Sequence, residues 1–241
     1  MVKKIKGIIL AGGTGSRLYP LTKVTNKHLL PLGGEPMIHH PIRRLVDAGI
    51  EEIMIVTGIE HCGGIMSLLG SGAEYGCFFT YKVQDKPDGI AGALRLCKDF
   101  VGDSRCVVVL GDNIFKEDLT QHIEAFNTSV NDCKLFFRRV SDPRRYGVGI
   151  FKKKKIVGIE EKPEMPKSNL ACVGIYMYSN KVFDAIEKIE PSSRGEYEIT
   201  AVNNYFIDNQ SCSYCELKQR WADAGTMDSY NAANSWAYNE K

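Results

Sequence analysis

Over its first two thirds the sequence alternates short apolar runs with stretches of helical periodicity, and this alternation restricts the possible folds more than any other feature. Four apolar runs have the length of a buried strand: residues 5–11, 52–57, 78–83 and 106–110. Repeated strand–helix–strand units build a parallel sheet, and their crossovers are right-handed. The pattern therefore predicts an α/β fold with a doubly wound, mixed, mainly parallel sheet.

Helical periodicity occupies the gaps between the apolar runs. One helical face is predicted by apolar residues at spacings i, i+4, i+7 and i+8, namely Ile38, Ile42, Leu45 and Val46. Gly49 is placed to end this helix. A second stripe precedes the fourth apolar run and consists of Leu94, Cys97 and Val101. The strand–helix–strand order therefore repeats.

Beyond about residue 135 the pattern changes to shorter strands. Strands are predicted over residues 147–151 and 156–160, and the charged residues 152–155 between them are interpreted as the solvated tip of a hairpin. One more strand is expected at residues 171–178. Three helices are expected, at residues 181–188, at residues 197–206 and after residue 226. Internal repeats and linkers are absent from the sequence, so residues 1–241 are predicted to form one domain.

Composition excludes several classes of partner. A formal net charge of +2 is too small to indicate binding to nucleic acid. No run reaches the roughly 18 apolar residues of a membrane span, and the apolar stretch after the first lysines is shorter than the roughly 7 residues of a signal segment. The eight cysteines are spread through apolar runs, as expected of reduced thiols. We expect a cytoplasmic protein that binds neither nucleic acid nor a membrane.

A glycine-rich loop directly follows the first apolar run. It reads Leu10-Ala11-Gly12-Gly13-Thr14-Gly15-Ser16-Arg17-Leu18, and Lys27 comes soon after it. Glycines let backbone N–H groups approach a phosphate closely, while Arg17 and Lys27 add positive charge. The loop is therefore predicted to bind phosphate.

Two known phosphate-binding patterns do not fit this loop. Leu18 stands where a dinucleotide fingerprint needs its third glycine, and the chain has no G-K-[ST] sequence of a P-loop. A tight turn that merely requires glycine is the structural alternative. The nearby Arg17 and Lys27 favour the anion site.

One segment, GGTGSRLYPLTKVTNKHLLPLGGEPMI, resembles the signature of the sugar-1-phosphate nucleotidylyltransferases. Within that family it is most similar to the glucose-1-phosphate thymidylyltransferases. Seven further segments are similar to that family in the same order: YKVQDKPDGIAGAL, VVVLGDNIF, DPRRYGVGIF, EEKPEMPKSN, VGIYMY, RGEYEIT and WADAGT. The resemblance implies a Rossmann-like nucleotide-diphospho-sugar transferase fold. Its nucleotide-binding core would span about residues 1–135, and a smaller strand-rich sugar-binding portion about residues 136–225.

The same resemblance implies that dTTP and glucose 1-phosphate react to give dTDP-glucose and pyrophosphate. The catalytic residues would be Arg17, Lys27, Lys162 and Asp112. The nucleotide would be bound by Leu10, Gly12, Gly13, Thr14, Gly15, Ser16, Arg17, Gln84, Gly89 and Asp112. The sugar phosphate would be bound by Tyr146, Gly147, Glu161, Lys162, Val173, Tyr176 and Arg194. Because a phosphate nucleophile is already an anion, none of the five histidines is needed as a base.

Magnesium is the implied cofactor, with Asp112 and Asp223 as its protein ligands. Magnesium usually takes one or two carboxylates together with substrate phosphates and water. From the residues alone, an Asp-Asn turn at Asp112 and a helix N-cap region at Asp223 are the alternatives.

Gln84 and Gly89 correspond to the base-reading pair of the family, which implies a pyrimidine with an imide edge. A single methyl contact is worth only about 1 to 3 kcal/mol, so UTP stays an alternative to dTTP. Glucose is the default sugar, and other hexose 1-phosphates are the runner-up substrates. A non-catalytic sugar-nucleotide sensor is the second function class, and it would lack Asp112, Asp223, Lys162 or Arg194, all of which are present.

Three features depart from the family pattern. Ala201 stands where relatives usually have aspartate, and Gly92 where many have glutamine. The chain also resembles a short form, because long members continue beyond the WADAGT segment and its helix into a regulatory region. A homo-oligomer is implied by the resemblance, and feedback inhibition through that region is expected to be absent or altered. The sequence Cys212-Ser213-Tyr214-Cys215 is interpreted as an alternating strand and not as a metal site.

Overall fold

The computed structural model describes residues 4–239 and contains one nine-stranded mixed sheet. All four apolar runs form strands: β1 (Lys6–Ala11), β4 (Glu52–Gly58), β5 (Phe78–Gln84) and β6 (Cys106–Leu110). They pair in parallel in the order β6-β1-β4-β5. The predicted doubly wound α/β fold is confirmed.

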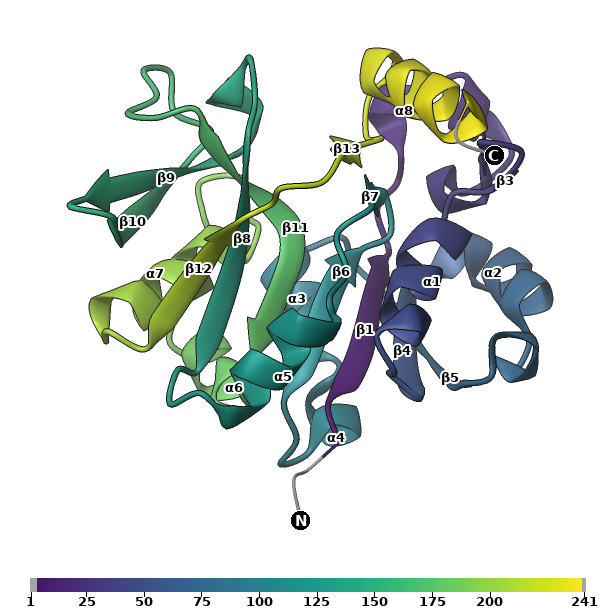
Figure 1. Ribbon diagram of the computed structural model, residues 1–241. Helices are drawn as coiled ribbons and strands as arrows, with labels where there is room; N and C mark the ends of the chain where they lie inside the picture. The colour runs from purple at the N-terminus through teal and green to yellow at the C-terminus, as the bar shows by residue number, and fades with distance from the viewer. Residues whose placement is uncertain (1–3, 240–241) are drawn as a thin grey trace.

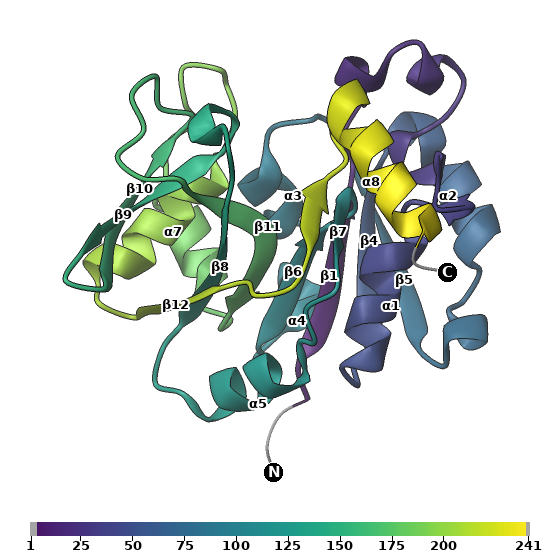
Figure 2. The same ribbon diagram turned by 45° about the horizontal axis from the view of Figure 1, so that its top comes forward.

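The other half of the sheet is mostly antiparallel. It contains β8 (Cys133–Arg139), β9 (Gly147–Lys152), β10 (Lys155–Glu161), β11 (Leu170–Tyr178) and β12 (Cys212–Glu216). Strand β11 joins the halves, because it pairs with β8 along one edge and, along the other edge, with β9 in its first part and with β6 in its last part. Figures 1 and 2 show β9 and β10 on one side of the molecule and β4 and β5 on the other.

Helices cover both faces of the sheet. Helices α1 (His39–Asp47), α2 (Cys62–Leu69) and α5 (Thr120–Thr128) pack on the face that carries Ile9 and Val107. The face with Ile8 and Val108 is covered by α3 (Ile90–Arg95), α4 (Lys98–Val101), α6 (Val182–Ile186) and α7 (Ile199–Asp208). The strands therefore bury side chains on both faces, as their continuous apolar runs indicate.

The predicted helix through residues 94–101 is interrupted. Its apolar stripe is buried as expected, but Cys97 N–H donates to the carbonyl of Leu94, and this tighter turn separates α3 from α4. The predicted hairpin is confirmed: β9 and β10 pair antiparallel, and Lys153 and Lys154 adopt positive φ in the turn. The Cys212–Glu216 segment is the predicted strand, and all eight cysteines are free thiols.

A small layer lies over the carboxyl ends of the parallel strands (Figure 1). Here β7 (Asn113–Phe115) pairs with β13 (Trp221–Asp223), and β2 (Pro31–Leu32) pairs with β3 (Glu35–Pro36). Helix α8 (Met227–Asn239) packs over them through Tyr230 and Ala233. Through this layer, the last part of the described chain lies at the same edge of the sheet as the glycine-rich loop.

The predicted division near residue 135 falls within β8, inside the continuous sheet. None of the helices within residues 4–239 combines the length and apolarity that a membrane crossing requires.

Candidate active site

Two adjoining cavities open at the carboxyl ends of β1, β5 and β6. One, of about 370 Å³, is lined by the glycine-rich loop together with Lys27, Gln84 and Gly89. The other, of about 470 Å³, is lined by Tyr146, Gly147, Tyr176 and Asp223. Both share a junction formed by Arg17, Asp112, Glu161, Lys162 and Arg194. The structure therefore brings the predicted nucleotide set, and all of the predicted sugar-phosphate set except Val173, to one continuous space.

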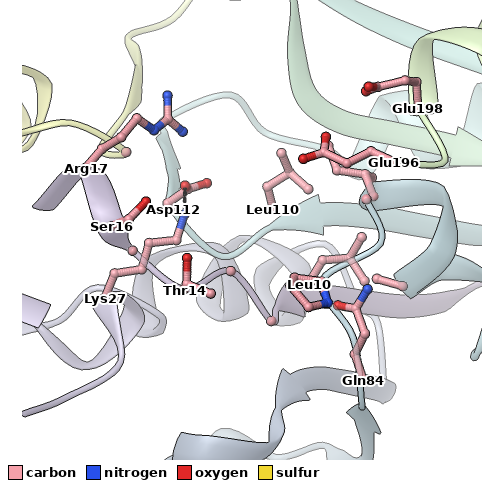
Figure 3. A pocket seen from close by; sticks show the side chains of 18 of the residues that line it. Leu10, Thr14, Ser16, Arg17, Lys27, Gln84, Leu110, Asp112, Glu196 and Glu198 are labelled. Atoms are coloured by element: carbon pink, nitrogen blue, oxygen red, sulfur yellow. Dashed lines mark hydrogen bonds and ion pairs between the residues drawn. The ribbon is translucent and has the colours of Figure 1, made fainter. Parts of the chain in front are cut away.

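The glycine-rich loop runs along the floor of the first cavity. Gly15 has φ +68°, and a β-carbon there would lie 2.8 Å from Thr22 Cγ2, so both conformation and space require glycine. A β-carbon on Gly13 would lie 3.5 Å from Lys27 Nζ, which places this ammonium beside the loop backbone. Figure 3 shows Ser16, Arg17, Lys27 and Asp112 gathered at one end of the cavity, with Leu10 and Gln84 at the other.

Lys27 and Asp112 form a buried ion pair between the loop and the end of β6 (Figure 3). Burial by itself would raise the pKa of Asp112, but the Lys27 ammonium and hydrogen bonds from Lys27 and Asn113 outweigh burial and hold this pKa below its usual range. Asp112 is therefore an anion that faces the glycine-rich loop.

Asp223 lies close to Asp112 in the fold, although the two residues are far apart in the sequence. The pairing of β13 with β7 sets Asp223 opposite Asn113, and the N–H of Ala224 donates to the carbonyl of Asp112 at 2.9 Å. A β-carbon on Gly225 would lie 2.8 Å from Asp223 Oδ1 and 3.4 Å from Asp112 Oδ2. Glycine at 225 thus leaves open a small space that two carboxylates border.

At the far end of the first cavity, Gln84 and Gly89 lie where β5 passes into α3. The side chain of Gln84 is only 8% exposed, and a β-carbon on Gly12 would lie 2.6 Å from its Oε1. Gly89 has φ +101° and packs against the backbone of Tyr197. Gly12 and Gly89 are therefore required by the close approach of neighbouring groups.

In the second cavity, Glu161 is held by a hydrogen bond from the Thr200 hydroxyl and lies against Gly147. Tyr146 packs edge-on against Trp221, with ring centroids 5.8 Å apart. Val173 behaves differently from the other predicted sugar residues, because side chains alternate along β11. Cys172, Gly174 and Tyr176 line the cavity, whereas the Val173 side chain is fully buried in the core on the opposite face. The side chain of Val173 therefore does not reach the cavity.

Lys162 and Arg194 meet at the junction of the cavities. Lys162 has φ +43°, a conformation that is uncommon without glycine, and its N–H donates to the Tyr146 carbonyl. Arg194 contacts Glu198 at 2.7 Å, Glu196 at 3.5 Å and Glu161 at 3.7 Å. These carboxylates hold the guanidinium at the junction.

Comparison with known proteins identifies the family. The nucleotidyl transferase family matches residues 6–240. The chain belongs to this family. Named relatives include the glucose-1-phosphate thymidylyltransferases of Neisseria meningitidis, 39% identical over 236 residues, and of Xanthomonas campestris, 43% identical over 234 residues. The matches cover 96% and 95% of this chain, and 82% and 79% of those relatives.

Solved structures agree with the family assignment. A Bacillus anthracis protein, provisionally described as a glucose-1-phosphate thymidylyltransferase and solved with sucrose, is 53% identical with a TM-score of 0.94, covering 98% of this chain and 96% of its own. A UDP-glucose pyrophosphorylase with bound UDP-glucose has a TM-score of 0.87 at 22% identity, covers 99% of this chain and 100% of its own, and shows the shared fold alone. This nucleotidyl transferase is therefore an enzyme with the nucleotide-diphospho-sugar transferase fold.

Enzymes of this family generally use a divalent metal, and the carboxylate pair of this nucleotidyl transferase fits one. Burial and the neighbouring Asp112 raise the pKa of Asp223 to about 6, because two carboxylates repel each other without a cation between them. Among the described residues, no group of three or more His, Cys, Asp and Glu side chains is arranged for a metal. Two carboxylates suit a hard cation that also binds substrate phosphates.

We predict that Mg²⁺ stabilises this nucleotidyl transferase more at about pH 7.5 than at about pH 5. The raised pKa of Asp223 means that its ionisation in the folded protein lowers stability as pH rises through about 6, and a cation offsets that loss. The stabilisation by Mg²⁺ is measured as the difference in melting temperature between MgCl₂ and KCl at equal ionic strength. In Asp223→Asn this difference should no longer depend on pH. An equal Mg²⁺ shift at both pH values would contradict the prediction.

Three residues near the site were missed by sequence reasoning or given no role. Glu196 and Glu198 line both cavities, and their only sequence signal is their position beside Arg194. His28, like the other histidines, was given no role, yet it is buried against Gly111, and burial lowers its pKa to about 3. Its neutral imidazole donates from Nδ1 to Asn26, which fixes the segment that carries Lys27.

Proposed function

We propose that the protein transfers a thymidylyl group from dTTP to glucose 1-phosphate and releases pyrophosphate. The observation that carries the proposal is the junction of the two cavities, where Arg17 and Asp112 of the predicted nucleotide set and Lys162 and Arg194 of the predicted sugar-phosphate set line both cavities. The thymidylyltransferase names of the relatives support the choice of substrates. Residues 1–135 act mainly on the nucleotide and residues 136–225 on the sugar.

The proposed reaction is an in-line attack of the sugar phosphate on the α-phosphorus of dTTP. The glycine-rich loop holds the phosphates through backbone N–H groups, and Arg17 stabilises the charge of the departing pyrophosphate. Lys27 orients the phosphates beside Gly13. Lys162 and Arg194 hold the phosphate of the sugar at the junction. An anionic nucleophile needs no base, in keeping with the buried, neutral His28.

Asp112 and Asp223 are the proposed Mg²⁺ ligands. When bound there, Mg²⁺ neutralises charge on the substrate phosphates. Asp112 also has a role that does not depend on the metal. It pairs with Lys27 and holds the Lys27 ammonium beside the glycine-rich loop.

Gln84 and Gly89 are proposed to read the base. A glutamine amide offers one donor and one acceptor, which match the N3–H and O4 of thymine and equally of uracil. UTP is therefore the second candidate nucleotide, since uracil differs from thymine only by the 5-methyl group and the ribose of UTP adds only a 2′-hydroxyl. We expect the enzyme to act in the cytoplasm as a homo-oligomer.

Pyrophosphate release tests the proposal, with Mg²⁺ and glucose 1-phosphate present and dTTP, UTP, CTP, ATP or GTP added separately. The expected result is release with dTTP, and slower release with UTP. Release with UTP alone would make the enzyme a uridylyltransferase. No release with any nucleotide, even after other hexose 1-phosphates are tried, would refute the reaction and favour a sensor that binds without turnover.

A further inference from the structure

Asp88 contacts the amide of Gln84 from outside the predicted site. Gln84 Nε2 donates to Asp88 Oδ1 at 2.7 Å, and the other carboxylate oxygen of Asp88 lies 3.5 Å from Arg95. The backbone of Asp88 is fixed as well, because its carbonyl accepts from Tyr197 N–H at 2.7 Å. Asp88 is therefore anchored at both its main chain and its side chain.

This contact determines which way the Gln84 amide faces. A carboxylate accepts hydrogen bonds but has none to donate, so the amide must turn Nε2 toward Asp88. Oε1 is then on the side of Gly12, where a β-carbon would lie 2.6 Å away. One N–H of Nε2 remains for a ligand, next to the acceptor Oε1.

Gly92 leaves the room that Asp88 occupies. A β-carbon built on Gly92 would lie 2.1 Å from Asp88 Oδ1 and 2.5 Å from Asp88 Cγ, so any other side chain displaces the carboxylate. Gly92 lies within α3 and has no positive φ, so its backbone does not itself require glycine. Glycine in the interior of a helix is otherwise unfavourable, and the space for Asp88 gives it a reason.

We infer that Asp88 is a positioning residue that sets the base specificity of Gln84 by fixing the orientation of its amide. The inference rests on the proposed nucleotidyl transfer and on the reading of the base by Gln84. In the fixed orientation, Oε1 accepts from the N3–H of thymine and Nε2 donates to its O4. Cytosine presents an acceptor at N3 and a donor at N4, so it needs the opposite orientation. That rotation would turn Oε1 toward the Asp88 carboxylate and set two acceptors against each other.

The experiment compares dTTP with 5-methyl-dCTP, which differ only at the edge that Gln84 faces. In Asp88→Asn, the new amide accepts or donates, so Gln84 adopts either orientation. We expect the ratio of kcat/KM for dTTP to that for 5-methyl-dCTP to fall about tenfold or more, as the loss of one hydrogen bond that orients the amide allows. The KM for glucose 1-phosphate should stay unchanged. Gly92→Ala should change the ratio in the same direction by displacing Asp88.

Asp85→Asn is the matched control, because Asp85 is an exposed carboxylate of the same loop. It should keep the wild-type ratio. Absence of turnover by the wild-type enzyme with any nucleotide would refute the proposed function itself. An active wild type whose ratio is unchanged in both Asp88→Asn and Gly92→Ala would refute the inference alone. Circular dichroism and melting temperature establish that each variant is folded, and Gly92→Ala keeps the inference testable if Asp88→Asn does not fold.

Discussion

Asp112→Asn is expected to lower kcat by about a hundredfold to a thousandfold, while the protein stays folded. The change removes one charge from the carboxylate pair beside Gly225, and a metal-assisted stabilisation of several kcal/mol corresponds to that range of rate. Asparagine keeps the shape of the side chain. Lys27 borders the cavity, so water can solvate its ammonium when the ion pair is lost. Pyrophosphate release at saturating substrates gives kcat.

Asp228→Asn provides the control for Asp112→Asn, since it removes an exposed carboxylate at the start of α8. It should leave kcat at the wild-type value. A loss of melting temperature in Asp112→Asn without a loss of turnover would mean that Asp112 is structural and that the carboxylate pair does not serve the reaction.

Arg17→Ala is expected to cost about a hundredfold to a thousandfold in kcat, as the loss of one well-placed donor to a developing oxyanion does. The Arg17 side chain lies at the junction of the two cavities, and a β-carbon on Gly225 would lie 3.4 Å from its guanidinium. Loss of the Arg17 guanidinium should therefore weaken the stabilisation of the departing pyrophosphate. Arg17→Lys should recover part of the rate, because it restores the charge but not the fork of donors.

Lys23→Ala removes an exposed cation from the same segment and is the matched control for Arg17→Ala. We expect wild-type kinetics from it. If Arg17→Ala raised only the KM for dTTP and left kcat intact, Arg17 would contribute to ground-state binding and not to stabilisation of the leaving group.

Local patterns in the sequence determined most of the fold. The apolar runs became β1, β4, β5 and β6, and the glycine-rich loop lies where the first run ends. The order of these elements was predictable because period and length reflect local conformation and burial. Short strands such as β7 and β13 could not be predicted in this way, because they have three residues each, which is too few to show a period.

Local sequence patterns predicted the site only where one segment carries its parts, as in the loop from Gly12 to Arg17. The family resemblance implied that Asp112 and Asp223 share a metal, but the tertiary structure decided how they approach, through the pairing of β13 with β7. It also decided that Val173 faces away from the cavity, since one residue of register on β11 exchanges the two faces of the sheet.

Gly12 and Gly92, which both lie beside polar side chains, show the same difference between what the sequence and the fold reveal. The sequence presented Gly12 as part of a phosphate loop and Gly92 only as a departure from glutamine. The fold shows what each leaves room for: Gln84 beside Gly12, and Asp88 beside Gly92. A sequence determines which residues are small, polar or charged, and it predicts the conformation of each segment. Which distant side chains share a space depends on crossovers and strand register, which form only when the sheet is assembled.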